Sequence, residues 1–222
     1  NVSENKVDRE IVEAWLEAAT AAGYRRTVDY NREEQEGVGY FQMTMKNGRR
    51  CSSAAAYLTP VRKRSNLHIF TNAHSEKLLI DGNDVTGVRC KIQGKSVDIS
   101  ARREVILSAG SIGSPQLLML SGIGDVAELR PHGIDVLHQL PGVGKNLQDH
   151  LQARPVFKCR ASTINTETKN MFQLAAIAFQ YALNRSGPMA MAASLGTGFL
   201  KTRAELECPD IQFHIQPFSA DN

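Results

Sequence analysis

Hydrophobic and polar positions recur with two different periods along the N-terminal part of the chain, and they predict a helix followed by a strand. Over residues 8–22, apolar side chains return at helical spacing, and Gly23 suits the position just after the helix ends. From residue 40 to residue 45, polar and apolar side chains alternate as they do on a strand. The Asn47–Gly48 pair then predicts a tight hairpin turn.

Two further short elements are predicted before the middle of the chain. Residues 52–58 (SSAAAYL) suit a short helix that Ser52 or Ser53 caps and that ends before Pro60. Residues 66–72 (NLHIFTN) are rich in β-forming side chains and predict a strand.

The middle of the chain is predicted to be rich in β-structure. Residues 76–100 are interrupted by turn residues at Asp81–Asn83 and at Gln93–Gly94, which predicts a three-stranded antiparallel meander. Residues 104–110 (EVILSAG) form a short apolar run without polar alternation. Such runs are typical of strands in sheets that are covered on both faces.

A glycine-rich turn is predicted between this strand and a helix. Gly110–Gly113 would form the turn, Ser114 suits the N-cap, and Pro115 suits the first helical position. Gly122 suits the end of this helix, and an Asp125–Glu128 capping box predicts the next one. Such a turn can bring bare backbone N–H groups toward an anion, or it can serve tight packing alone.

The C-terminal part predicts a strand at residues 153–159, a helix at 170–183 and a strand at 210–218. The helix carries apolar residues along one side, which favours core packing over a membrane role. These residues are Phe172, Ala175, Ala176, Phe179 and Leu183.

Composition excludes several classes of protein. The chain has 42% hydrophobic and 22% charged residues, as globular proteins do. Its net charge of +3 is too small and too scattered for a nucleic-acid binder. No apolar run reaches the ~18–20 residues of a membrane-spanning helix, and no signal segment opens the sequence. Two N-x-S sequons, at Asn1 and Asn184, are compatible with a secreted protein.

Neither the cysteines nor two glycine motifs predict a metal, redox or nucleotide-binding site. The four cysteines stand far apart and form no CxxC pair, so we expect isolated, buried thiols rather than a metal or redox motif. Residues 122–127 match G-x-G-x-x-A but follow a helix, whereas the dinucleotide fingerprint follows a strand. Residues 141–146 lack two positions of a P-loop.

Three motifs, in this order and spacing, resemble the glucose-methanol-choline (GMC) oxidoreductases. They are NGRRCSSAAAYLTPVRKRSNLHIFTNAHSEKLL, VILSAGSIGSPQLLMLSGIG and LPGVGKNLQDHL. The stretch Gly110–Gly124 is similar to a signature of that family over its whole length. The resemblance extends over nearly the whole chain, and it points to the FAD-dependent glucose dehydrogenase branch, which passes electrons to quinones.

The resemblance implies a mixed α/β (α+β) fold. We expect part of an FAD-binding domain of the GMC type with an antiparallel β-meander, followed by the start of a substrate-binding domain. The implied divisions are a helical segment at 1–36 that borders the substrate domain, an FAD-binding portion at 37–150, and the beginning of the substrate-binding domain at 151–222.

FAD is the implied cofactor, and the resemblance assigns a few residues to it. Ser75 matches the position whose backbone meets the adenine side of FAD, although valine is usual there. Ala109 and Gly110 match the turn beneath the adenosine half of the cofactor. Residues 146–150 match the segment that leads into the substrate domain, and within it we interpret His150 as structural.

The implied activity is oxidation of the CH–OH group of an alcohol or sugar, with a quinone or another electron acceptor. The family's GxGxxG loop and its catalytic His–His or His–Asn pair have no counterpart in this sequence. We therefore expect an internal fragment that is inactive alone, and we assign no catalytic and no metal-binding residue.

Two other readings stay open at this point. One is a serine hydrolase, because residues 109–113 (AGSIG) are close to a nucleophile elbow with Ser111 as the nucleophile. Its partners would be His150 or His214, together with Asp210. The other is a catalytically dead relative of the flavoenzymes that still binds flavin.

Overall fold

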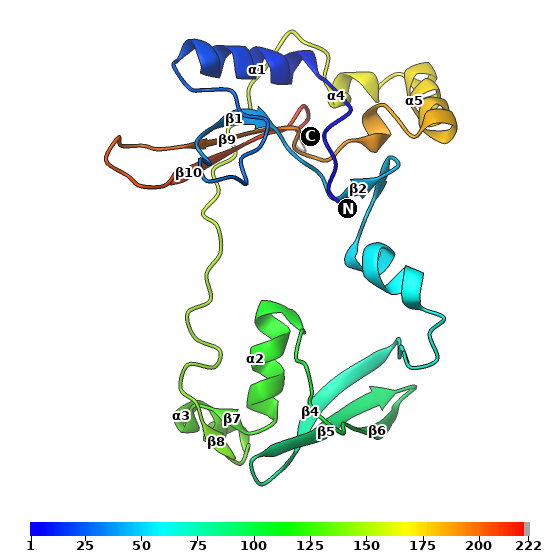
Figure 1. Cartoon of the computed structure of the whole chain (residues 1–222), viewed down its shortest axis with the longest axis vertical. Helices are drawn as coiled ribbons and strands as arrows, with labels where there is room; N and C mark the ends of the chain where they lie inside the picture. The colour runs from blue at the N-terminus through cyan, green and yellow to red at the C-terminus, as the bar shows by residue number, and fades with distance from the viewer. Residues whose placement is uncertain (220–222) are drawn as a thin grey trace. The chain divides into compact units, whose positions relative to one another are not determined.

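The computed structural model describes residues 1–219, and the chain forms two compact units. Unit 1 combines Asn1–Leu67 with the chain from Arg154 onward, and unit 2 is His68–Ala153 (Figure 1). Both units join helices to small, mainly antiparallel sheets. The predicted mixed α/β class is therefore confirmed.

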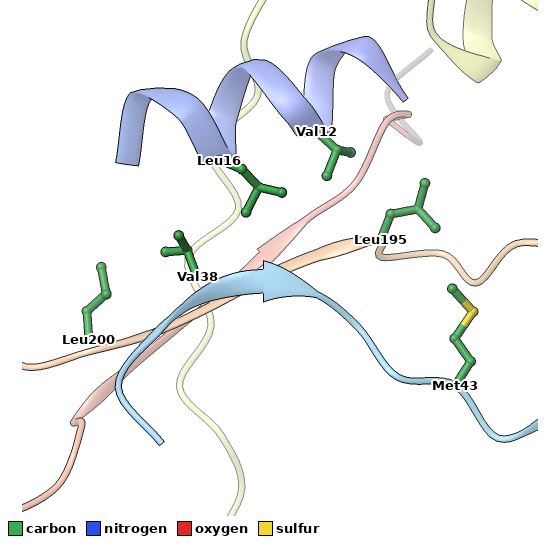
Figure 2. Close-up of a cluster of buried hydrophobic side chains, with 6 residues drawn as sticks. All are labelled: Val12, Leu16, Val38, Met43, Leu195 and Leu200. Atoms are coloured by element: carbon green, nitrogen blue, oxygen red, sulfur yellow. The ribbon is translucent and has the colours of Figure 1, made fainter. Parts of the chain in front are cut away.

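Unit 1 is built on a three-stranded antiparallel sheet that helix α1 (Glu10–Ala21) covers. The strands are β1 (Gly37–Tyr40), β9 (Gly196–Leu200) and β10 (Ile211–Ile215), in the order β1–β9–β10. Figure 2 shows the cluster of buried side chains in this unit, which consists of Val12, Leu16, Val38, Met43, Leu195 and Leu200. The amphipathic helix predicted at the N-terminus thus packs as its pattern required.

Two glycines of β9 allow α1 to approach the sheet closely. A Cβ atom at Gly196 would lie 3.0 Å from the Val12 side chain, and one at Gly198 would lie 3.0 Å from that of Trp15. Larger residues would push the helix away from the strand. The sequence predicted no strand here, because glycine is a poor strand former.

The remaining elements of unit 1 are short except for one helix. They are β2 (Met45–Lys46), β3 (Arg49–Arg50), η1 (Ala54–Leu58), η2 (Thr59–Val61), α4 (Ile164–Glu167), α5 (Met171–Asn184) and η4 (Pro188–Ala190). The predicted Asn47–Gly48 turn is confirmed, with positive φ at both residues. Ser52 caps the following helical turn, since its Oγ accepts from Ala55 N at 3.2 Å. Helical turns continue through Pro60, because proline fits the first turn of η2.

Unit 2 contains the predicted meander and a helix. The meander is confirmed as β4 (Ala73–Asp81), β5 (Asp84–Ile92) and β6 (Lys95–Ser100), all antiparallel. It is followed by α2 (Gly110–Leu120), β7 (Ile123–Gly124), α3 (Val126–Leu129), η3 (Arg130–His132) and β8 (His138–Gln139). Asp125 caps α3, as predicted, by accepting from Ala127 N at 3.0 Å.

A buried serine joins α2 to the meander. Ser121 Oγ accepts from Leu78 N at 2.8 Å and donates to Leu117 O at 2.5 Å. Ser121 follows the last residue of α2, so this contact fixes the C-terminal end of the helix on β4.

The start of α2 differs from the prediction. The helix begins at Gly110, so the predicted turn 110–113 is its first turn and Pro115 lies inside it. Ser114 Oγ accepts from Ala109 N at 3.0 Å, which holds the entering chain against this first turn. The proline is tolerated because its fixed φ is helical and it removes only one backbone hydrogen bond near the start.

Three predicted strands are wrong, at residues 66–72, 104–110 and 153–159, and the strand predicted over residues 40–45 is interrupted, because β1 ends at Tyr40 and β2 begins at Met45. The structure assigns no strand to residues 66–72, 104–109 or 153–159, and β4 begins only at Ala73. Ile106 is 79% exposed, although its apolar run predicted a buried strand. A strand requires a hydrogen-bonding neighbour, and the described residues provide none for these segments.

The functional division into 1–36, 37–150 and 151–222 stays a prediction. By contacts, residues 37–67 belong to unit 1 together with the chain after Arg154. Among residues 1–219, no helix combines the length and the apolar character needed to cross a membrane.

Candidate functional site: the start of helix α2 and an aromatic sheet face

The N-terminal end of α2 is an uncapped helix terminus. Gly110 opens the helix at a φ of +85°, and no side chain caps it at Ala109. The first N–H groups of a helix have no partner within it, so those of Gly110–Ile112 are available to another acceptor. No acidic residue stands in the first turn, so the positive end of the helix dipole is not offset there.

Glycine at position 110 has a conformational cause and leaves room beside it. A φ of +85° is strained for any residue with a side chain, and a Cβ built at Gly110 meets no atom within 4 Å. By contrast, a Cβ at Gly113 would lie 3.2 Å from that of Ala109. Open space above unpaired N–H donors fits the close approach of an electronegative group, such as a phosphate or sugar oxygen of FAD.

Ser75, the third residue predicted to meet the cofactor, lies on β4 opposite Cys90 of β5. Its Oγ is 3.7 Å from Cys90 Sγ, so its hydroxyl has a weak partner. The ladder is irregular just after it, between Ser75 and Lys77. In the described chain no hydrogen bond joins Ser75 to Ala109 or Gly110. Helix α2 is attached to β4 through Ser121, at the C-terminal end of the helix.

The sheet of unit 1 carries an aromatic cluster that the sequence analysis missed. The ring of Tyr30 lies 5.2 Å from that of Phe199 and 6.0 Å from that of Phe41, and Phe41 lies 5.1 Å from His214. Because Gly198 faces α1, its neighbour Phe199 points to the opposite face of the sheet.

The members of this cluster differ in exposure. Tyr30 is buried, its Oη accepts from Gln42 N at 3.1 Å, and burial raises its pKa. Phe41 is half-buried and His214 is exposed, so these two form the accessible edge. The four residues come from four separate segments, which are the loop before β1, the residue after β1, β9 and β10, and no sequence pattern links them.

Comparison with known proteins identifies the family. Residues 1–152 match the family model described as GMC oxidoreductase. The chain belongs to the GMC oxidoreductases. The oxygen-dependent choline dehydrogenases of Brucella ovis and Staphylococcus xylosus are 41% and 42% identical to it, over 97% and 96% of this chain. The match covers 39% and 38% of those two proteins, so the chain spans about two-fifths of the length of these curated relatives.

Solved structures agree with this membership. An FAD-dependent oxidoreductase from Chaetomium thermophilum matches with a TM-score of 0.78 at 26% identity, over 90% of this chain and 36% of that one. Formate oxidase from Aspergillus oryzae matches with a TM-score of 0.75 at 29% identity, over 89% and 35%. The first of these proteins is an FAD-dependent enzyme and the second carries FAD, which agrees with the cofactor predicted for this GMC chain.

Family membership and the contacts within each unit disfavour a serine hydrolase. Ser111 lies in the first turn of α2, and within unit 2 no hydrogen bond joins it to a histidine. Asp210 instead accepts from Thr202 N at 2.8 Å and from Thr202 Oγ1 at 2.5 Å, and these bonds lower its pKa. His150 lies in an exposed coil, where its backbone N–H bonds the Asp149 carboxylate.

The thiols are isolated but differ in burial. All four cysteines are free, as predicted. Cys90 is buried and Cys51 is half-buried, whereas Cys159 and Cys208 are exposed, so the expectation of burial is wrong for the last two. Within the described residues, no group of three or more His, Cys, Asp or Glu side chains is placed to hold a metal ion.

Proposed function

We propose that the full-length protein containing this chain oxidises the CH–OH group of a small alcohol, with FAD as its cofactor. Family membership over residues 1–152 carries this proposal. The chain would contribute part of the FAD-binding domain and, from residue 151 onward, the beginning of the substrate-binding domain. When bound, FAD accepts the hydride that leaves the alcohol carbon.

The residues proposed to hold FAD act mainly through their backbone. The N–H groups at the start of α2 would donate to an oxygen of the adenosine half, and Gly110 keeps a Cβ out of the way. Ala109 would pack beneath the same part. Ser75 would contribute main-chain contact on the adenine side, because its side chain already faces Cys90.

Choline is the proposed first substrate. The relatives that are 41% and 42% identical are named choline dehydrogenases. Quaternary ammonium ions bind favourably over aromatic faces, and the accessible edge formed by Phe41 and His214 offers such a surface in unit 1. A sugar such as glucose, predicted from the sequence motifs, is the second substrate to test. Oxygen and a quinone are the two acceptors.

The test is anaerobic reduction of the flavin in the full-length protein. The purified holoprotein is mixed with choline, glucose or a simple primary alcohol, and the flavin absorbance is followed. Loss of the oxidised flavin spectrum with one alcohol, and its return on adding oxygen or a quinone, supports the proposal. Bound flavin that no alcohol in a broad panel reduces would favour a catalytically dead relative. A purified protein without affinity for FAD would overturn the cofactor assignment.

A further inference from the structure

The end of helix α5 carries one of the two N-x-S sequons of the chain. The triplet is Asn184–Arg185–Ser186, and its middle residue is not proline. Asn184 is the last residue of α5, and Arg185 leaves the helix in the left-handed conformation, with φ 51° and ψ 41°. Figure 1 shows α5 at the margin of unit 1. The sequon therefore lies where a helix gives way to a turn, a surface setting that suits a bulky modification.

The residues that follow Asn184 turn back onto α5. The Arg185 guanidinium lies over the Tyr181 ring, 4.8 Å from its centroid. Ser186 Oγ accepts from Gln180 Nε2 at 3.4 Å. The next residue, Gly187, has a φ of +78°, and a Cβ there would collide with the Gln180 side chain. These contacts give the turn a defined conformation on the helix end.

Asn184 itself is exposed and makes no side-chain contact of this kind. Arg185 and Ser186 are half-buried, whereas Asn184 is exposed. Its amide forms no hydrogen bond within residues 1–219. Both the nitrogen that would be modified and the space outside it are therefore accessible in unit 1.

The other sequon, Asn1–Val2–Ser3, offers a comparison within the same unit. Its acceptor nitrogen, Asn1 Nδ2, donates to Met45 O. Ser3 is tied to Met43 by two backbone hydrogen bonds of 2.8 and 2.9 Å. The acceptor amide and the third residue of this sequon are thus both engaged in the fold, and modification of Asn1 would break at least the first of these contacts.

An oligosaccharide at Asn184 would also supply polar cover that α5 lacks. The helix has no charged residue from Met171 to Asn184, and none of its side chains is buried. Leu183, beside the acceptor, is 64% exposed, and Phe179, one turn earlier, is 66% exposed. Contiguous apolar surface favours aggregation, whereas an attached oligosaccharide is bulky and solubilising.

We propose that Asn184 is an attachment site for an N-linked oligosaccharide. The donor is an oligosaccharide on a polyprenyl diphosphate, which the transferase of the secretory pathway supplies. Asn184 Nδ2 forms a bond to C1 of the first sugar, the bond from C1 to the diphosphate oxygen breaks, and the amide releases one proton. Nothing is oxidised or reduced. Ser186 provides the hydroxyl that completes the acceptor motif.

The test expresses the complete protein in a eukaryotic cell line, once with its own N-terminus and once behind a cleavable secretion signal. Secreted and retained protein are both treated with peptide N-glycosidase F in water labelled with heavy oxygen. This enzyme converts a glycosylated asparagine to a labelled aspartate, and peptide mass spectrometry identifies the labelled residue. We expect label at residue 184 in both forms and a lower labelled fraction at residue 1.

Matched variants separate the glycan from misfolding and from spontaneous deamidation. Asn184→Gln and Ser186→Ala should each abolish the label, whereas Ser186→Thr keeps the hydroxyl and should retain it. Asn1→Gln should leave the label at residue 184 unchanged. All four variants should keep a cooperative melting transition. A folded wild type without label at Asn184 overturns the proposal, as does label that appears only with the added signal or that persists in Ser186→Ala.

Discussion

The assignment of FAD to the start of α2 is tested most directly by replacing Gly110 with valine. The substitution places a branched side chain in open space, since a Cβ at Gly110 meets no atom within 4 Å. The Cβ atom itself therefore creates no clash among the described residues. Two effects remain, which are the strain of a side chain at a φ of +85° and the obstruction of any group that approaches the helix end.

Gly94 offers a matched control for the strain. It has a φ of +80°, and a Cβ there also meets no atom within 4 Å. A residue other than glycine in this region costs about 1–3 kcal/mol, so Gly94→Val and Gly110→Val should lower stability by similar amounts. Gly94 lies in the turn between β5 and β6, which has no proposed contact with FAD. Any difference in flavin binding between the two variants is then due to position 110.

We expect Gly110→Val to lose its flavin and Gly94→Val to keep it. A hydrogen bond to a charged group contributes about 1.5–3 kcal/mol, so losing one at the helix end weakens FAD binding by about 10- to 150-fold. The assay is the ratio of flavin to protein absorbance after desalting the full-length protein, followed by titration of the apoprotein with FAD. Equal flavin content in the two variants would refute the assignment and leave the turn with a packing role only.

Three further predictions concern single side chains. Ser75→Val should leave turnover unchanged and improve FAD retention by up to about 1 kcal/mol, because it gives up only the weak contact with Cys90; earlier flavin release during denaturant titration would contradict this. Thr197→Val should raise the unfolding free energy by about 1 kcal/mol, since Thr197 Oγ1 is buried without a partner; a lower denaturation midpoint would mean that the hydroxyl is bonded in solution. Glu167→Gln should cost about 2 kcal/mol at neutral pH, because it removes the negative charge and one of the two oxygens that accept from Arg9 at 2.5 and 3.1 Å. The Arg9 bonds lower the pKa of Glu167, so its stabilisation is full above the ordinary pKa and is lost as the pH falls through the lowered one; a constant difference from wild type down to acid pH would contradict it.

The sequence predicted turns and helix ends correctly where a few neighbouring residues determine them. The Asn47–Gly48 and Gln93–Gly94 turns need only residues that tolerate positive φ, and both are present. The Asp125 cap and the amphipathic α1 likewise depend on a few neighbouring positions. Pro115 misled the prediction because proline is compatible with both the first turn of a helix and a position slightly further in.

The sequence predicted one of the two parts of the candidate site, the start of α2, and missed the other. Gly110 was predicted because it lies both in a family motif and at a turn. In the structure its φ of 85° is a conformation that favours glycine. The aromatic face of unit 1 was not found, since Tyr30, Phe41 and Phe199 have no shared spacing. Tertiary pairing of β1 with β9 brings them together, and the aromatic spacing alone does not specify that pairing.

The three wrong strand predictions have the same cause, since a sequence pattern does not specify the tertiary partner of a segment. An apolar run such as residues 104–108 predicts burial, whereas a strand also needs a neighbour whose N–H and C=O groups complete the ladder. The run carries no information on where that neighbour lies in the sequence. Helix α5 differs in kind, because a helix makes its backbone hydrogen bonds within its own segment and needs no neighbouring strand to complete them. Residues 104–108 therefore lack strand structure in this chain, whereas α5 forms as predicted. The core packing predicted for α5 is wrong within the described residues, because its apolar side chains are exposed there.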